Sequence, residues 1–477
     1  MNEVRPDAEV ALVIDLDGTL LKSDLLVEST LSLLGRKPWL VLQLPLWLSR
    51  GKAHLKQEIA RRVELDVTCM PWDERVLALA REHAGQRPVV LCTASDERLA
   101  SAVARHLGVF DAVIASDGQR NLSGAAKAQA LCERYGERGF DYVGNGRADL
   151  AVWAKARRAI VANAPQSLAR AAAANCELDS HLPSTGGQWR SWAKALRLHQ
   201  WLKNVLLFVP VLAAHRFFEL DTLLRCGLGF VAFSLCASSV YLLNDLLDLT
   251  ADRHHPSKSK RPFAAGRLPL VHGLAAVPML LLSAFALALW LSPLFAGVLA
   301  LYYVLTLAYS LRLKKRVMVD VIALAGLYTI RILAGGALIA TPPSYWLLAF
   351  SMFLFLSLAM LKRYTELLAL VGRGRSKTSG RGYDVDDLHL LQSFGAASGY
   401  QAVLVLALYI NSSASELLYR HPQVLWLWCP MLLYWISRAW MIAYRGVMRD
   451  DPVIFAATDR VSQVVLVVCA AIAAGAI

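Results

Sequence analysis

Charged side chains are scarce in this sequence of 477 residues, where they make up 18% of the chain against 56% hydrophobic residues. The mean hydropathy is +0.41. A disordered chain is excluded, because such chains have few hydrophobic and many charged residues. The same balance argues against a purely soluble protein. The length exceeds what one ordinary domain needs, so two or three domains are expected.

Cysteine patterns that bind zinc are missing. None of the eight cysteines stands in a Cys-x-x-Cys pair, and no His/Cys cluster has zinc spacing. The cysteines are therefore predicted to be small buried apolar side chains. The first residues also lack a basic segment followed by an apolar one. No cleaved signal is predicted, and the N-terminal part is expected to stay in the cytoplasm.

The formal net charge of +13 lies entirely in the second part of the chain. Residues 1–185 contain 23 Lys and Arg against 23 Asp and Glu, whereas residues 186–477 contain 27 against 14. An excess of this size suggests binding of nucleic acid or of an anionic membrane. Because the excess falls in the apolar part, we expect a membrane protein that binds no nucleic acid.

Residues 1–180 are predicted to form a soluble α/β domain of the doubly wound type. Short apolar runs predict buried parallel strands, and helical patterns alternate with them. The predicted strands cover residues 10–15, 88–94, 112–116, 141–145 and 159–163.

A mostly helical insert, predicted to be a cap, interrupts this domain at residues 24–85. Within it, the segment PWLVLQLPLWL (38–48) is unusually apolar but too short to span a bilayer. Either a buried cap helix or a segment lying on the membrane fits this composition. Residues 181–195 have the composition of a linker.

Residues 196–477 are predicted to form an all-α membrane domain with nine transmembrane helices. The apolar runs lie near 205–218, 224–243, 274–292, 294–311, 319–340, 345–361, 400–414, 424–440 and 461–477. Loops after even-numbered spans carry 19 Lys and Arg, whereas loops after odd-numbered spans carry 3. The basic loops, and with them the soluble domain, are therefore expected on the cytoplasmic side of a bacterial-type inner or plasma membrane.

The motif DLDGTLL follows the first predicted strand and presents Asp15 and Asp17. Two residues apart at a strand end, both carboxylates can point at one site. Phosphoryl transfer through an aspartyl intermediate needs one carboxylate as nucleophile and a second as acid and base for the leaving group. The motif therefore predicts a phosphatase-like site.

Further candidate residues follow in the order that such a site needs. Thr93 ends a predicted strand, where its hydroxyl could hold phosphate, and Lys127 could neutralise the charge of nucleophile and phosphate. The segment GNGRADLAVW offers Asn145 and Asp149 as oxygen ligands for magnesium. The ordered set resembles the haloacid dehalogenase-like hydrolase superfamily over about 170 residues.

The resemblance implies a phosphatase with Asp15 as nucleophile and Asp17 as acid and base. It implies one magnesium ion, held by Asp15, the Asp17 carbonyl and the fourth motif. That motif usually begins Gly-Asp, but residue 145 is Asn, a neutral ligand that should bind magnesium more weakly. Asp149 could compensate, and a weakened or regulatory domain is the alternative. The phosphate ligands that the resemblance implies are Thr93 and Lys127.

An aspartate-rich segment, YLLNDLLDLTADRHHPSKSKRPFAAG (241–266), ends the second predicted span. Asp245, Asp248 and Asp252 are spaced by three and four residues, which places them on one helical face. Three carboxylates at a membrane helix end repel one another unless divalent cations lie between them. One or two magnesium ions there could hold a diphosphate. The other candidates in this segment are Asn244 as a ligand and Lys258 and Arg261 for anion binding.

The run NDxxDxxxD followed by KxxRP is similar to that of the UbiA prenyltransferase superfamily, over about residues 190–477. The resemblance implies nine transmembrane helices and a diphosphate substrate held on two magnesium ions between two aspartate-rich motifs. The second motif is expected in GRGYDVDDLHLL, where the usual spacing of two aspartates four apart is absent. The candidates there are Tyr383, Asp384, Asp386 and Asp387.

Four more segments resemble decaprenyl-phosphate phosphoribosyltransferases: LHQWLKNVLLFVPV, YSLRLKKRVMVDV, IRILAGG and LKRYTELL. This resemblance implies 5-phosphoribosyl diphosphate and a polyprenyl phosphate as substrates, with diphosphate released. Two anionic substrates need several binding groups. The candidates are Lys203, Asn204, Arg331, Lys362, Arg363 and Arg381.

Structural roles are alternatives for three of these cations. Arg331 falls inside a predicted span, where an unpaired charge is unfavourable, so snorkelling or pairing with an acid such as Asp320 is the other interpretation. Lys203 and Lys362 lie near span ends, where lysines also anchor helices at the interface.

A combined hypothesis follows: the phosphatase-like domain removes the 5-phosphate that the transferase leaves on the ribose, which yields polyprenyl-phospho-ribose. An aromatic prenyltransferase with an unrelated or inactive phosphatase domain is the alternative. A non-catalytic scaffold is a third possibility.

Overall fold

The computed structural model describes residues 10–184, 187–372, 382–448 and 451–477. The chain divides into two compact units, the first comprising 1–196 and 241–277 and the second 197–240 and 278–477. Residues 241–277, predicted as part of the membrane domain, thus group with the N-terminal unit. Two helices belong to both units. α11 (Leu220–Leu247) begins in the second unit and ends in the first, and α13 (Leu270–Leu291) begins in the first and ends in the second.

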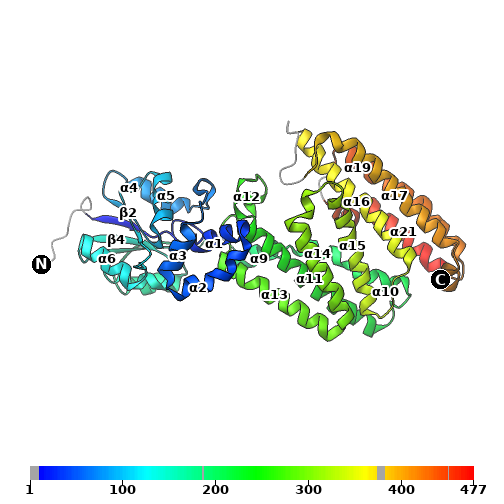
Figure 1. The fold of residues 1–477 in the computed structure, drawn as a ribbon, viewed down its shortest axis with the longest axis horizontal. Helices are drawn as coiled ribbons and strands as arrows, with labels where there is room; N and C mark the ends of the chain where they lie inside the picture. The colour runs from blue at the N-terminus through cyan, green and yellow to red at the C-terminus, as the bar shows by residue number, and fades with distance from the viewer. Residues whose placement is uncertain (1–9, 185–186, 373–381, 449–450) are drawn as a thin grey trace. The chain divides into compact units, whose positions relative to one another are not determined.

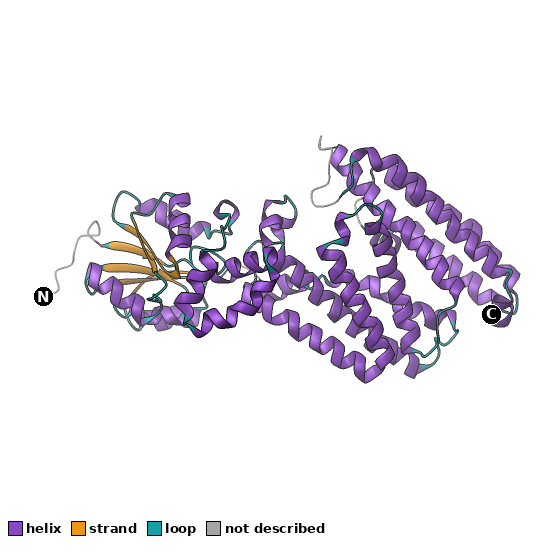
Figure 2. Cartoon of the chain, viewed as in Figure 1, coloured by secondary structure: helices purple, strands orange, loops and turns teal. Residues whose placement is uncertain are grey.

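A parallel sheet, orange in Figure 2, forms the centre of the first unit. It has six strands in the order β3-β2-β1-β4-β5-β6. The strands are β1 (Ala11–Ile14), β2 (Val89–Asp96), β3 (Ala112–Ser116), β4 (Phe140–Gly144), β5 (Arg158–Ala162) and β6 (Glu177–Leu182). The order reverses between β1 and β4, so the predicted α/β doubly wound sheet is confirmed. In such sheets ligands bind outside the carboxyl ends of the strands at this reversal.

The side chains of β1 alternate between the two faces of the sheet. Ala11 and Val13 join one buried cluster, and Leu12 and Ile14 join another, as the two-residue period of a strand requires. Helices cover both faces (Figure 1), which explains why β1 is apolar at all of its residues. These helices are α4 (Glu74–His83), α5 (Glu97–Leu107), α6 (Ala125–Tyr135), α7 (Leu150–Trp153) and α8 (Gln166–Ala173), and the short η4 (Arg147–Asp149) leads into α7.

The predicted insert is helical. It contains α1 (Leu25–Arg36), η2 (Pro38–Gln43), α2 (Leu44–Ser49), α3 (Lys52–Ala60), η3 (Val67–Cys69) and α4 (Glu74–His83). The interpretation of residues 38–48 as a buried helix is wrong, because most of their large apolar side chains are exposed. The unit also contains α9 (Gln188–Ala195), α12 (Leu249–His254) and η6 (Lys258–Lys260).

Six helical segments in the described residues are long and apolar enough to cross a membrane: α11, α13, α14 (Pro293–Leu311), α15 (Val319–Leu338), α16 (Tyr345–Val371) and Val385–Ile410. The last comprises η8 (Val385–Asp387) and α17 (Leu388–Ile410). A bent pair, α20 (Pro452–Thr458) and α21 (Arg460–Ala476), makes a seventh if it counts as one span. An integral membrane protein is therefore confirmed.

Two predicted spans form shorter elements, so the number nine stays a prediction. Residues 205–218 fall in η5 (Leu198–Phe208) and α10 (Val209–Ala213), where Pro210 lies at the helix start. Residues 424–440 fall in η9 (Pro422–Leu427) and α19 (Trp428–Tyr444). The remaining short elements are η7 (Leu313–Lys315) and α18 (Ser413–Leu418).

Burial differs strongly among the spans. In the 18-residue apolar stretch of α13, only 11% is buried inside the protein, whereas in the corresponding stretch of α15 the buried share is 67%. The second unit thus has a protein-enclosed helix, α15, which carries Arg331.

Candidate active sites

Asp15 lies at the carboxyl end of β1, where its backbone N–H donates to the Val143 carbonyl at 2.9 Å. Lys127 of α6 donates to Asp15 Oδ1 at 2.6 Å, and the Thr19 hydroxyl donates to Oδ2 at 3.3 Å. Both Asp15 and Lys127 are buried. A buried carboxylate held by an ammonium is oriented and charge-balanced, as a nucleophile towards an anionic phosphate must be.

Asp17 accepts hydrogen bonds from the Leu25 backbone at 2.8 Å and from the Ser95 hydroxyl at 2.7 Å. Thr93 lies beside them, with its hydroxyl 3.4 Å from Asp17 Oδ2. Burial, reinforced by the neighbouring Asp24 carboxylate, raises the pKa of Asp17 to about 7. A carboxyl group with a pKa near neutrality can both donate and accept a proton in catalysis.

Sequence reasoning missed Ser95. It follows Thr93 by two residues in β2, the spacing that places two strand side chains on one face, and this signal could have identified it.

The turn after β1 requires glycine at position 18. Gly18 has a φ of +77°, and a Cβ there would lie 2.1 Å from the Asn145 amide nitrogen. Asn163, which the sequence did not single out, donates to the carbonyls of Gly18 and Thr19 at 3.1 Å each. These contacts fix the turn that directly follows Asp15 and Asp17.

A hydrogen-bond chain links Lys127 to the loop after β4. Lys127 donates to the Tyr142 hydroxyl at 3.0 Å, which donates to Asp149 Oδ1 at 2.8 Å. Asp149 Oδ2 accepts the backbone N–H groups of Asn145 and Gly146 at 3.0 and 2.9 Å. Burial opposes the charge of Lys127, but Asp15 and Asp149 outweigh it and raise its pKa above the usual range.

Oxygen donors gather where β1 and β4 end side by side. Asp15 and Asn145 directly follow these neighbouring strands, and the Asn145 side chain packs against the Gly18 turn. Carboxylate and amide oxygens suit a hard cation such as magnesium. Asp149 already accepts hydrogen bonds at both oxygens, so in this structure it positions the loop that carries Asn145.

In the aspartate-rich segment, two buried carboxylates form ion pairs with one arginine. Arg261 Nη1 donates to Asp245 Oδ1 at 3.0 Å and to Asp252 Oδ2 at 2.6 Å. Asp245 and Asp252 are buried, whereas Asp248 is exposed at the junction of α11 and α12. The two buried oxygens enclose a position that favours positive charge, which fits magnesium. Of the other candidates, Asn244 is half-buried and Lys258 is exposed.

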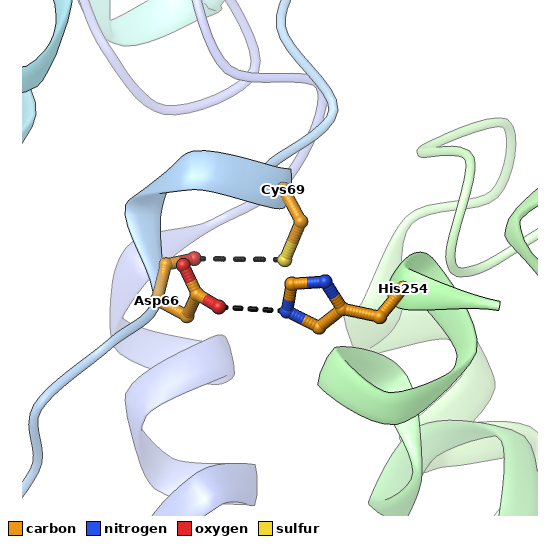
Figure 3. A group of neighbouring side chains, drawn as sticks. All are labelled: Asp66, Cys69 and His254. Atoms are coloured by element: carbon orange, nitrogen blue, oxygen red, sulfur yellow. Dashed lines mark hydrogen bonds and ion pairs between the residues drawn. The ribbon is translucent and has the colours of Figure 1, made fainter.

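The aspartate-rich segment is also bound to the cap insert, residues 24–85. Arg253 pairs with both Glu28 oxygens at 2.7 and 2.6 Å, and both side chains are buried. His254 Nε2 lies 2.7 Å from Asp66 Oδ2 (Figure 3). Cys69 joins this pair within 4.8 Å, a group of possible metal ligands that sequence spacing could not reveal.

Two of the predicted substrate-binding lysines share one acid in the second unit. Lys203 and Lys362 donate to Asp451 Oδ2 at 2.9 and 2.6 Å. Asp451 precedes α20 and was not singled out, because nothing in its local sequence distinguishes it. Since two ammonium groups face one carboxylate, the cluster keeps a net positive charge.

Arg331 is buried in α15 and contacts aromatic rings and neutral oxygens. It donates to Asn204 Oδ1 at 2.9 Å, to the Tyr302 hydroxyl at 3.2 Å and to a carbonyl of its own helix. Its guanidinium carbon lies within 5.6 Å of three ring centroids, those of Phe233, Tyr302 and Tyr328. No carboxylate of the described residues pairs with it, so the alternative of pairing with Asp320 is wrong.

Arg363 instead belongs to a structural ion pair. It donates to both oxygens of the fully buried Asp320, to Glu366 at 2.6 Å and to the Tyr309 hydroxyl at 2.9 Å. These acids already balance its charge, so the structure gives no support to the predicted role of Arg363 in substrate binding.

Replacing Arg363 by Met is expected to destabilise the second unit by about 3–5 kcal/mol, because Asp320 would stay buried without a counter-ion. The melting temperature in detergent measures the change. Arg225→Met removes an exposed pair with Asp221 and should shift the melting temperature little. Equal effects of the two variants would contradict the structural role of Arg363.

The predicted second aspartate motif forms a helix cap. Asp384 accepts the Val385 backbone N–H at 2.6 Å, and Asp387 accepts that of Asp384 at 2.9 Å. Asp386 is exposed, and the buried Tyr383 hydroxyl accepts a bond from the Met318 backbone. Arg381 lies outside the described residues.

Comparisons with known proteins match both parts of the chain. Residues 205–457 match the model of the UbiA prenyltransferase family, and residues 12–153 match that of haloacid dehalogenase-like hydrolases. An uncharacterized protein of Sinorhizobium fredii is 35% identical over 96% of this chain and 89% of its own length.

Two further similarities concern the second part. The decaprenyl-phosphate phosphoribosyltransferase of Mycobacterium tuberculosis is 39% identical over 36% of this chain, and the match spans 59% of that enzyme. Among solved structures, a UbiA homologue from Archaeoglobus fulgidus bound to GPP and Mg²⁺ matches 60% of this chain and 99% of its own, with a TM-score of 0.46 and 15% identity.

Proposed function

Since the chain belongs to the UbiA prenyltransferase family and carries a haloacid dehalogenase-like domain, we propose that it transfers 5-phosphoribosyl from phosphoribosyl diphosphate to a polyprenyl phosphate. The main supporting observation is the buried Arg331, which contacts only neutral groups among the described residues. The Tyr328 ring lies 5.6 Å both from Arg331 and from Lys203. An acceptor with a phosphate would place an anion beside Arg331, whereas a neutral aromatic ring would leave this guanidinium without one.

The reaction breaks the bond between ribose C1 and the diphosphate and joins C1 to a phosphate oxygen of the lipid. Asp245 and Asp252 would hold magnesium, which when bound supplies neutralising charge for the departing diphosphate. Arg331 and Lys203 would orient the lipid phosphate towards C1. Positioning and charge stabilisation of this kind usually dominate such transfers.

The phosphatase domain would then remove the 5-phosphate. Asp15 attacks phosphorus while Asp17 protonates the departing ribose oxygen; water next cleaves the aspartyl phosphate, and Asp17 accepts its proton. The product is polyprenyl-phospho-ribose. Asp15 and Asn145 would hold one magnesium ion, and Lys127 with Thr93 would bind the phosphate.

Carrying both domains in one chain raises the effective concentration of the second site for the first product. The Sinorhizobium relative aligns over 96% of this chain, so it contains both parts as well. The basic loops favour placing both sites on the cytoplasmic side.

Label from radioactive phosphoribosyl diphosphate should enter the lipid fraction when the purified protein is reconstituted with polyprenyl phosphate. Chelation of divalent cations should stop the incorporation, because magnesium holds the diphosphate. A parallel reaction receives an allylic prenyl diphosphate and 4-hydroxybenzoate. Prenylation of the ring without labelling of the lipid would favour the aromatic prenyltransferase instead.

A further inference from the structure

Five large apolar side chains project from η2 and α2 of the cap insert. Their exposed fractions are 63% for Trp39, 47% for Val41, 81% for Leu42, 57% for Leu46 and 49% for Leu48. We name these five residues the cap patch. Leu40 and Trp47 of the same segment are buried against Ile59 and Val63. The segment is therefore anchored on one side and presents its apolar residues on the other.

Positive charge flanks the cap patch on both sides. Between Glu28 and Glu58 the chain contains no acidic residue. The exposed Arg36 and Lys37 precede the patch, the exposed Arg50 and Lys52 follow it, and they form no ion pair within the described part of the chain. Apolar residues bordered by Lys and Arg are the composition of segments that lie in an anionic membrane interface.

Helix α1, which leads into the cap patch, lies against the end of a candidate membrane span. A Cβ on Gly35 would be 4.0 Å from the carbonyl oxygen of Leu247, the last residue of α11. The buried pair between Glu28 and Arg253 holds α1 to the helix that follows α11. Since transmembrane helices end at the membrane interface, the patch begins a few residues from head-group level.

We propose that the cap patch inserts into the head-group layer of the bilayer and that the flanking basic residues bind anionic phospholipids. This contact does not depend on the proposed reaction. It would hold the phosphatase site at the membrane, because α3 follows the patch and its Lys56 donates to the Ala94 carbonyl and Asn121 near Asp17. A phosphate ester linked to a lipid could then reach the site without leaving the bilayer.

Photo-crosslinking tests the contact in the full-length protein. Leu42→p-benzoylphenylalanine is reconstituted in nanodiscs of phosphatidylcholine with about one quarter phosphatidylglycerol. Irradiation should give lipid adducts in about tenfold higher yield than His106→p-benzoylphenylalanine, whose residue is exposed on α5. Hydrolysis of p-nitrophenyl phosphate by both variants confirms that the domain is folded.

Two results would overturn the proposal. A lipid yield at position 42 no higher than at position 106 excludes membrane contact, and a protein–protein adduct at position 42 assigns the patch to a second copy of the chain. The contribution of the basic residues to lipid binding is tested by adding Arg50→Glu and Lys52→Glu to the protein that carries p-benzoylphenylalanine at position 42. This change should lower the lipid yield several-fold, and an unchanged yield would remove the electrostatic part of the proposal.

Discussion

Asp245→Ala is expected to lower the transfer of label from phosphoribosyl diphosphate to lipid by about 10³-fold or more. Asp245 is buried and, with Asp252, encloses the position that Arg261 now fills with positive charge. Without this carboxylate the proposed site would lose a magnesium ligand, and the departing diphosphate would lose neutralising charge. Initial rates of lipid labelling at saturating magnesium measure the effect.

Asp221→Ala is the matched control, because Asp221 stands at the other end of the same helix and its side chain is 79% exposed. It should leave the transfer rate nearly unchanged. The melting temperature and the hydrolysis of p-nitrophenyl phosphate show whether Asp245→Ala has unfolded the protein. A folded Asp245→Ala variant that still labels lipid would exclude the proposed metal site.

Asp15→Asn is expected to lower the release of phosphate from the lipid-linked sugar by about 10³-fold or more, because the variant lacks the proposed nucleophile. The amide keeps the shape of the side chain and can still accept a bond from Lys127. Transfer itself should continue. The lipid-linked 5-phosphoribose should therefore accumulate, which chromatography of the lipid extract measures.

An exposed acid of the same unit provides the control for this variant. Asp117→Asn should give the wild-type ratio of phosphorylated to dephosphorylated lipid, since Asp117 lies on a loop and its carboxylate accepts bonds from the backbone of Gln119 and Arg120. If Asp15→Asn removes the phosphate as fast as wild type, the nucleophile is another residue. If neither protein makes labelled lipid, the proposed transfer fails, whereas the phosphatase can still be tested with p-nitrophenyl phosphate.

Local sequence patterns were sufficient to predict the central strands and to single out the pair of carboxylates at the end of β1. The runs around β1 and β2 are apolar because both faces of the sheet are covered, and this leaves a signal in a few consecutive residues. Asp15 and Asp17 follow from their spacing at a strand end. β6 was not predicted, because its sequence mixes exposed and partly buried residues and contains no apolar run.

Partners of the site residues could not be predicted in the same way. Lys127 is 112 residues from Asp15, and Asp451 is 248 residues from Lys203. Spacing within one element says nothing about such pairs. For this reason the sequence suggested Asp320 as an alternative partner of Arg331, whereas the structure pairs this acid with Arg363.

The sequence alone determined the two-part organisation, the α/β sheet, the membrane character and the aspartate-rich segment, because hydrophobic periodicity and short motifs depend on neighbours along the chain. Only the tertiary structure decided which charges neutralise one another, since Coulomb energies depend on distances through space and on burial. It alone distinguished Arg331, held by rings and neutral oxygens, from Arg363, paired with Asp320. For residues 38–48, where the sequence allowed either a buried cap helix or a segment on the membrane, it showed an exposed apolar surface, because burial depends on what the rest of the fold covers.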